Sequence, residues 1–220
     1  MLFNSYIFLF AFLPITLIVF YYLSYYANNR LTIMWLVFSS LFFYGWWNPI
    51  YLLFVIGSMG VNYIFGRSIL RGYKKKSSKN KYLFLSGITF NLLLLGYFKY
   101  ANFFIDNINV LFNNDFYLQA IVLPLGISFF TFEQIAYLVD TYRGDSKEYN
   151  LWKYCTFVSF FPQLIAGPIA HHNEIIPQLN NDKIYKFDYR NFAHGLTIFF
   201  IGLFKKVMIA DKMALIAIPV

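Results

Sequence analysis

Long stretches without a charged side chain dominate this sequence. No Asp, Glu, Lys or Arg occurs in residues 1–29, 31–66, 82–98 or 116–132. The hydrocarbon core of a bilayer is crossed by about 20 apolar residues in an α-helix. The 220 residues are 59% hydrophobic and 23% aromatic but only 13% charged, with a mean hydropathy of +0.53, a combination that soluble domains rarely show. The sequence therefore predicts an all-α, polytopic transmembrane helical protein.

The apolar runs, and the residues that interrupt them, predict a single transmembrane domain with several spans. The first lacks a basic leading region and a small-residue cleavage site, so we expect a retained helix and not a signal peptide. Pro124 should kink or restart the fifth, because it removes a backbone donor. The expected spans lie near 5–27, 31–47, 51–66, 82–98, 116–139, 154–169 and 191–210.

The run from Tyr154 to Ile169 is short, and two prolines and a glycine interrupt it between 162 and 168. A straight spanning helix is therefore not expected. We predict a short helix that ends near Phe161, followed by a re-entrant or broken segment near 162–168. Irregular backbone at membrane depth must be buried in protein or line a wet cavity, since lipid cannot satisfy its polar groups.

Basic residues are concentrated in one loop. Seven of the 18 Lys and Arg residues fall in 67–81, which contains no acidic residue. Such loops stay cytoplasmic, so three preceding spans place the N-terminus outside and Arg30 inside. Lys74–Lys76 are expected to contact anionic lipid. The net charge of +8 is thus a topology signal, and without a basic groove or a fold signature we expect no nucleic-acid partner.

Residues 101–114 are amphipathic. Their apolar side chains share one helical face, whereas Asp106, Asn109 and Asn113 lie on another. This pattern predicts a helix lying in the outer interface. A partly ordered loop is the alternative.

Four sequence blocks resemble a known family. They are LVFSSLFFYGWWNP (Leu36–Pro49), LPLGISFFTFEQIAYLVDTYRG (Leu123–Gly144), FFPQLIAGPI (Phe160–Ile169) and GLFKKVMIAD (Gly202–Asp211). In sequence, order and spacing they are similar to the N-terminal half of bacterial membrane-bound O-acyltransferases of the alginate O-acetyltransferase type. The resemblance covers nearly the whole chain.

The resemblance implies an O-acyltransferase of the bacterial cytoplasmic (inner) membrane. It implies transfer of an acetyl group from a thioester donor such as acetyl-CoA to a hydroxyl of an exported cell-surface polysaccharide. The implied partners are the lipid bilayer, the glycan acceptor and a periplasmic or extracellular acetylation protein. Members of the family are longer and carry their signature histidine in the C-terminal half. We therefore expect this chain to be the N-terminal part of a longer acyltransferase.

No residue here matches that signature histidine. The family places it in an apolar block such as Trp-His-Gly, and the three histidines, His171, His172 and His194, occur in other contexts. The resemblance therefore carries over the fold and the pathway but leaves the catalytic base unknown. Adjacent histidines on a helix point in different directions, so we expect no metal site from His171 and His172.

Acylation of a hydroxyl needs a base, a donor held close and groups that stabilise the oxyanion. Glu133 and Gln134 are polar residues inside an apolar helix, and an intramembrane carboxylate is a functional candidate by default. We expect both to line a tunnel or substrate cavity. The alternative for Glu133 is structural pairing with Arg143 or a lysine.

Two further residues complete the set of tunnel or substrate-lining candidates. Gln163 could satisfy backbone groups freed by the helix break or contact a substrate. His171 could act as a base near neutral pH, although a polar cap on the Gly-Pro turn is the favoured interpretation. Arg143 suits an anionic cofactor phosphate, but pairing with Asp140 or Asp145 is favoured.

A second function remains open. Broken helices at mid-membrane also build the substrate sites of transporters. The alternative is therefore a non-catalytic membrane subunit or a transporter-like component of a polysaccharide export assembly. An inverted repeat between two halves would favour that alternative, and the sequence shows none.

Overall fold

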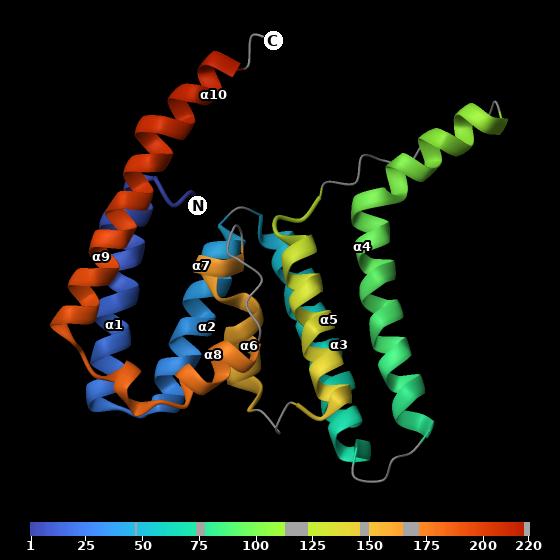
Figure 1. The fold of residues 1–220 in the computed structure, drawn as a ribbon, viewed down its shortest axis with the longest axis horizontal. Coiled ribbons are helices and arrows are strands. Elements are labelled where there is room, and N and C mark those ends of the chain that lie inside the picture. Colours follow the sequence, from blue (N-terminus) through green and yellow to red (C-terminus); the bar gives the residue numbers. More distant parts are fainter. Residues whose placement is uncertain (47, 74–77, 113–122, 146–149, 165–171, 218–220) are drawn as a thin grey trace. The chain divides into compact units, whose positions relative to one another are not determined.

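In the parts of the chain that the computed structural model describes, every regular element is a helix, which confirms the all-α prediction (Figure 1). Those parts are residues 1–46, 48–73, 78–112, 123–145, 150–164 and 172–217. Within them, four continuous helical stretches are long and apolar enough to cross a membrane: Phe8–Tyr26, Pro49–Gly72, Lys79–Phe112 and Tyr189–Ala214.

The elements divide into two compact units, residues 1–36 with 181–220 and residues 37–180, and the boundary falls inside α2. The prediction of one domain with seven spans stays a prediction. In chain order the helices are η1 (Phe8–Phe12), α1 (Leu13–Tyr26), α2 (Asn29–Gly45), α3 (Pro49–Tyr73), α4 (Ser78–Phe112), α5 (Ile127–Arg143), α6 (Leu151–Ser159), α7 (Phe161–Leu164), α8 (His172–Leu179), η2 (Asp182–Tyr185), α9 (Tyr189–Phe204), η3 (Lys205–Ala210) and α10 (Asp211–Ala217).

In the first unit, polar contacts join α1 to its neighbours. The Ser24 hydroxyl donates to the backbone carbonyl of Tyr185 in η2. The indole N–H of Trp35 donates to the carbonyl of Thr16, with 3.0 Å between nitrogen and oxygen. These bonds satisfy backbone groups where helices meet, so they fix α1 against α2 and η2.

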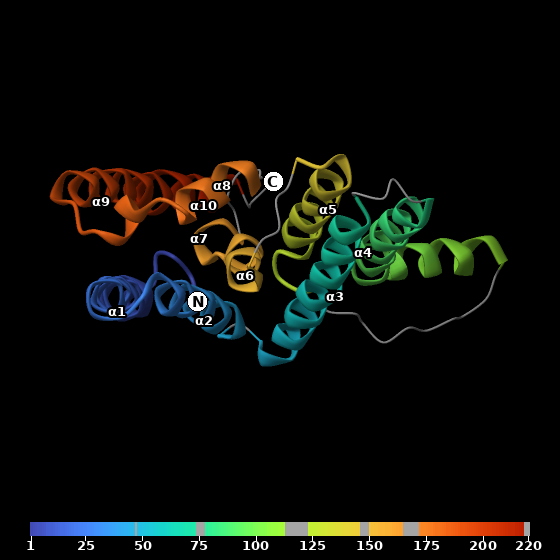
Figure 2. The same ribbon diagram turned by 90° about the horizontal axis from the view of Figure 1, so that it is seen from below.

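In the second unit, α5 packs against α3 and α4, and α6 packs against α3 and α5 (Figure 2). Glycines allow the closest approaches. A Cβ at Gly66 in α3 would overlap the ring of Tyr137, and one at Gly87 in α4 would lie 2.8 Å from Cδ1 of Leu138. Tyr137 and Leu138 both belong to α5, so α3 and α4 each approach this helix closely. Helix α5 is therefore the centre of the unit.

Two glycines with left-handed backbone delimit α5. Gly126 precedes its first residue with φ 70°, and Gly144 follows its last with φ 87°. Glycine takes this conformation without the steric penalty of a Cβ. The helix begins at Ile127, whose N–H donates to the carbonyl of Pro124 at 3.2 Å. The helix thus begins after Pro124, and residues 113–122 of the predicted span lie outside the described residues.

The predicted break after Tyr154 begins earlier than expected. Helix α6 ends at Ser159, two residues before the predicted end, and Phe160 has non-helical backbone with ψ 110°. Pro162 then lies in the first turn of α7, where a proline sacrifices no helical hydrogen bond. The chain therefore breaks before the proline and not at it. Residues 165–168 of the predicted segment lie outside the described residues.

Residues 101–112 are helical, and they continue α4 instead of forming a separate element. The alternative of a loop is wrong for this stretch. No glycine or proline occurs between Tyr97 and Phe112, so nothing stops the helix there. Figure 1 shows α4 bending towards its C-terminal end.

Candidate buried polar site

The two polar residues predicted at the centre of α5 are both fully buried. Glu133 is 1% exposed and Gln134 is 0% exposed. Successive residues on a helix point about 100° apart, so the two side chains face different neighbours. Gln134 faces α3, to whose Ser58 and Asn62 it is hydrogen-bonded, and Glu133 lies on the side of Tyr137 and α6.

Gln134 belongs to a hydrogen-bonded group that we call the amide cluster: Ser58, Asn62, Asn91 and Gln134. Oε1 of Gln134 accepts from the Ser58 hydroxyl at 2.8 Å and from Nδ2 of Asn62. Asn62 and Asn91 exchange hydrogen bonds, with nitrogen–oxygen distances of 2.6 and 3.1 Å. All four side chains are buried. The cluster therefore ties three helices together at one point.

The asparagines are also tied to their own helices. Nδ2 of Asn62 donates to the carbonyl of Ser58 at 3.0 Å, and Nδ2 of Asn91 donates to that of Gly87 at 2.8 Å. Each amide is thus held at both ends, so its orientation is fixed. Polar groups that are satisfied in a low-dielectric interior make strong, directional bonds.

Two groups next to this cluster keep unused hydrogen-bonding capacity. Nε2 of Gln134 and the hydroxyl of Thr131 are buried and have no hydrogen-bond partner among the described residues. The two residues lie one turn apart on α5, so their side chains are neighbours. A buried donor without a partner is unfavourable, which makes this place suited to a polar ligand.

The side of α5 that carries Glu133 meets an aromatic layer. The Tyr137 and Tyr154 rings lie 4.6 Å apart between centroids, and Tyr63 lies 5.5 Å from Tyr154. The Tyr154 hydroxyl is buried and without a hydrogen-bond partner in the described part of the chain. Glu133 lies within electrostatic range of that hydroxyl. A carboxyl and a phenol therefore lie near each other in an aromatic part of the interior.

The alternative for Glu133, structural pairing with Arg143 or a lysine, is not seen among the described residues. Among the described residues Glu133 has no hydrogen bond and no ion pair. Arg143 lies at the last turn of α5, where it is exposed. A base also needs a second group to orient it, and no described residue does so for Glu133.

Gln163 lies in α7, next to the helix break. The backbone N–H of Phe161 donates to the Ser40 hydroxyl at 3.3 Å, so Gln163 is not needed to satisfy it. Oε1 of Gln163 is buried and has no partner among the described residues. Both interpretations of Gln163, contact with a substrate and a bond to backbone of the break, therefore stay predictions, because residues 165–168 lie outside the described residues.

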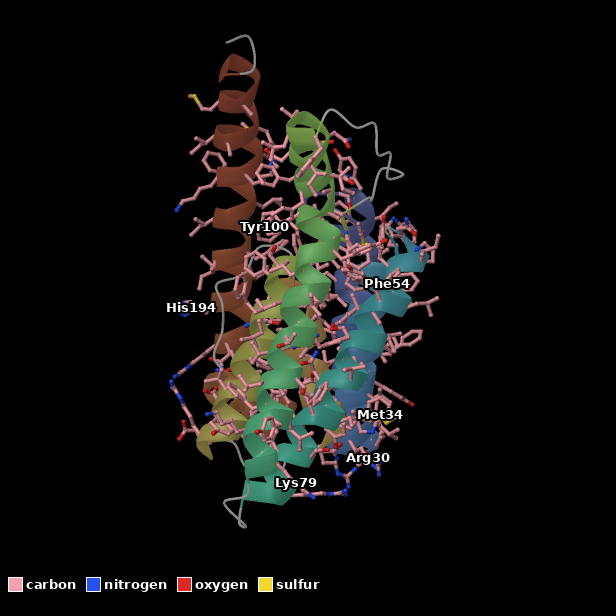
Figure 3. The ribbon with its side chains drawn as sticks, turned by 90° about the vertical axis from the view of Figure 1, so that its right-hand side faces the viewer. Arg30, Met34, Phe54, Lys79, Tyr100 and His194 are labelled. Atoms are coloured by element: carbon pink, nitrogen blue, oxygen red, sulfur yellow. The ribbon has the colours of Figure 1, made fainter. Side chains whose placement is uncertain are left out.

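The remaining candidates are not part of the described site. His171 and Lys74–Lys76 lie outside the described residues, and His172 is placed only by its backbone at the start of α8. His194 is exposed on α9 in the other unit (Figure 3). Within the described residues, no group of three His, Cys, Asp or Glu side chains could hold a metal ion.

Sequence reasoning missed Ser58, Asn62, Asn91 and Tyr154. Asn62 and Asn91 are each the sole asparagine of their predicted spans, 51–66 and 82–98. A lone asparagine in a predicted span could have indicated these two residues, because an amide inside a membrane helix requires a hydrogen-bond partner. Nothing in the sequence distinguished Tyr154 from the many other tyrosines of this chain.

An all-helical chain with four apolar helices of membrane-spanning length is an integral membrane protein. Comparison with known proteins narrows this class. The chain is 42% identical over 240 aligned residues to the peptidoglycan O-acetyltransferase of Helicobacter pylori, which covers 97% of this chain and 45% of that protein. It is 40% identical over 222 residues to the probable alginate O-acetylase AlgI of Pseudomonas aeruginosa, covering 99% of this chain and 41% of that protein.

The chain is therefore homologous to the peptidoglycan and alginate O-acetyltransferases of the membrane-bound O-acyltransferase family, which confirms the resemblance. It spans less than half the length of these curated relatives. A shorter match, 35% identical over 52 residues, links 24% of the chain to the teichoic acid D-alanyltransferase of Lacticaseibacillus rhamnosus. No family profile and no solved structure matches the chain.

Proposed function

We propose that this chain forms part of a membrane-bound O-acetyltransferase that acts on hydroxyls of an exported cell-surface polysaccharide. The observation that carries the proposal is identity of about 40% along nearly the whole chain to relatives named for acetylation of peptidoglycan and of alginate. The two acceptors differ, but both are polysaccharides outside the cytoplasm. The proposal assigns to this chain the chemistry that both relatives share, which is formation of an acetyl ester on a glycan hydroxyl.

In the proposed reaction, the acyl carbon of a thioester such as acetyl-CoA loses its bond to sulfur and gains a bond to the acceptor oxygen. The acceptor proton passes to a base, and the thiol is released with a proton. The described residues offer this reaction hydrogen-bonding groups in a dry interior, where such groups act strongly. Glu133, Gln134, Gln163 and His171 remain lining candidates, and we assign none of them as the base.

The proposed setting is the bacterial cytoplasmic membrane. In this setting the acyl donor is available on the cytoplasmic side. The glycan acceptor and a partner acetylation protein lie on the outer side. A passage that joins the two sides has to run through the helices, and α5 carries buried polar groups on two of its sides. We propose that α5 and the α6–α7 break wall part of that passage.

Deleting the gene tests this function. The expected result is loss of ester-linked acetate from the surface glycan, while the amount of glycan at the surface stays normal. A fall in the amount of exported glycan, with normal acetate on what remains, would favour the export subunit instead.

Point variants of the complete protein test the passage. Glu133→Leu and Gln163→Leu are each expected to lower glycan acetate, because they replace buried polar groups by apolar ones. Asn107→Leu is the matched control, since Asn107 is exposed and bonded only to its own helix. Normal acetate in both test variants, at normal protein levels, would contradict the proposed passage.

A further inference from the structure

The first unit contains an apolar groove between α1 and α9. The two helices run antiparallel, because Phe8 lies near Phe199, with ring centroids 6.4 Å apart, whereas Tyr21 lies 5.0 Å from Phe187. These aromatic contacts bridge the helices towards both ends of a groove of about 620 Å³. Its walls are apolar side chains such as Leu13, Leu17 and Leu196.

The groove lies at membrane depth. The stretches that form it, Phe8–Tyr26 and Tyr189–Ala214, are both candidate spans. Side chains on the lipid-facing surface of such spans meet hydrocarbon, so an acyl chain fits the chemistry of this apolar groove. Its volume falls in the range of roughly 300–1,000 Å³ that is typical of small-molecule sites.

One end of the groove is basic. Tyr21 and Phe187 mark that end, and Phe187 follows Lys186 directly. Arg30, Lys183, Lys186 and Arg190 are exposed in the turns there, and none of them forms an ion pair with a described residue.

The two acids of the same turns are already engaged. Asp182 accepts a hydrogen bond from Asn29 at 3.1 Å, and Asp188 caps the N-terminus of α9 by accepting from the N–H of Arg190 at 2.8 Å. The four basic residues outnumber these two acids, so the turns keep a net positive charge that can attract an external anion. Basic side chains beside a membrane attract anionic lipid headgroups.

We propose that this groove binds one acyl chain of an anionic bilayer phospholipid, whose phosphate lies against Lys186 and Arg190. The apolar walls supply the affinity for the chain, and the basic turns select the headgroup. The site lies in a different unit from the amide cluster and Glu133, so the inference is independent of the proposed acetyl transfer.

The experiment titrates the purified, delipidated protein with phosphatidylglycerol or phosphatidylcholine in detergent and counts bound lipid by native mass spectrometry. We expect saturable binding with preference for phosphatidylglycerol. Leu196→Trp fills the groove and should weaken binding about tenfold, since losing contact with only two methylene groups has that effect. Ile198→Trp, on the same helix but outside the groove lining, is the matched control.

The headgroup is tested separately. Lys186→Gln and Arg190→Gln should each weaken phosphatidylglycerol binding about fivefold and leave phosphatidylcholine binding unchanged. Lys212→Gln, an exposed lysine on α10, is the control. Leu17→Phe is a milder groove-filling variant for use if Leu196→Trp does not fold.

Three outcomes would overturn the proposal: no saturable lipid on the wild-type protein, equal effects of Leu196→Trp and Ile198→Trp, or equal affinity for the two lipids.

Discussion

Gln134 accepts hydrogen bonds from two different residues through one oxygen, while its nitrogen has no partner among the described residues. The two hydrogen bonds to Oε1 fix the position of the side chain, and Nε2 keeps its capacity to donate a hydrogen bond. If the proposed passage is correct, Nε2 of Gln134 is a fixed donor facing whatever polar group passes. The rigidity comes from the asparagine pair behind it.

Breaking that pair should destabilise the protein. Asn62→Leu removes both hydrogen bonds to the amide of Asn91 and one of the two that the oxygen of Gln134 accepts, and an unsatisfied buried polar group costs about 1–3 kcal/mol. We therefore expect a lower free energy of unfolding in detergent, measured by thermal or denaturant unfolding. Asn107→Leu should change it little. Equal stability of the two variants would contradict the role of the amide cluster.

Glu133 allows the lining role to be separated from a catalytic role. A lining residue needs shape and hydrogen-bonding capacity, which Glu133→Gln keeps and Glu133→Leu removes. A base needs a carboxylate, which both variants lack. We expect Glu133→Gln to retain most of the glycan acetate that Glu133→Leu loses, measured as ester-linked acetate per glycan. Equal loss in both variants would show that Glu133 is the base.

The sequence singled out Glu133 and Gln134 because polar residues stand out in an apolar run. It could not identify their partners. Asn62, Asn91 and Tyr154 become part of the site only when α3, α4 and α6 pack against α5, and hydrophobic periodicity does not encode which helices pair. His171 was proposed from its residue type alone, and the structure offers no test of that choice.

At the scale of elements, small residues decide how closely the helices of the second unit approach. Gly66 and Gly60 lie on the same helix, yet a Cβ would overlap the Tyr137 ring at Gly66 and meet nothing within 4 Å at Gly60. The same substitution at these two positions should therefore have opposite effects.

We expect Gly66→Ala to lower the free energy of unfolding by about 1–3 kcal/mol, because overpacking forces side chains and backbone to shift. Gly60→Ala should raise it by about 0.5–1 kcal/mol, because alanine loses less conformational freedom in a helix than glycine does. Thermal unfolding in one detergent measures both. Destabilisation by Gly60→Ala as large as that by Gly66→Ala would show that the contact with Tyr137 does not set the spacing.

Element boundaries show what could be predicted locally. The start of α5 after Pro124 followed from the chemistry of proline. The length of α4 could not be predicted in this way. The pattern changes from apolar to amphipathic at residue 101, but a single continuous helix shows the same change where it passes from the membrane interior to the interface. The end of α6 at Ser159 depends on Ser40, which binds the freed N–H of Phe161 from another helix. No local pattern contains that contact.

At the scale of the whole molecule, one hydrogen bond constrains the topology. Asn29 donates to Asp182, so the turn before α2 and the turn after α8 lie at the same end of the first unit. If α2, α3, α4 and α5 each cross the bilayer once, the chain returns to the side of Arg30. The segment containing α6 and α7 must then stay on that side, which supports the predicted re-entrant segment.

Cysteine labelling tests this topology. On a Cys155→Ser background, which removes the single cysteine of this 220-residue sequence, Lys79→Cys and Lys183→Cys should react only from the cytoplasmic side. Leu2→Cys and Asn102→Cys should react only from outside. Reaction of Lys183→Cys from outside would mean that α6 and α7 cross the membrane, and the re-entrant segment would then be wrong.

The reciprocal bonds between Asn62 and Asn91 also bear on how the protein is made. The ribosome completes α3 and α4 before Gln134 of α5 exists. A lone asparagine amide is poorly accommodated in lipid, but two that bind each other shield one another. The α3–α4 pair can therefore enter the bilayer as a hairpin that shields its own amides, and α5 joins it afterwards. The contacts of the finished protein thus agree with the order in which its helices are synthesised.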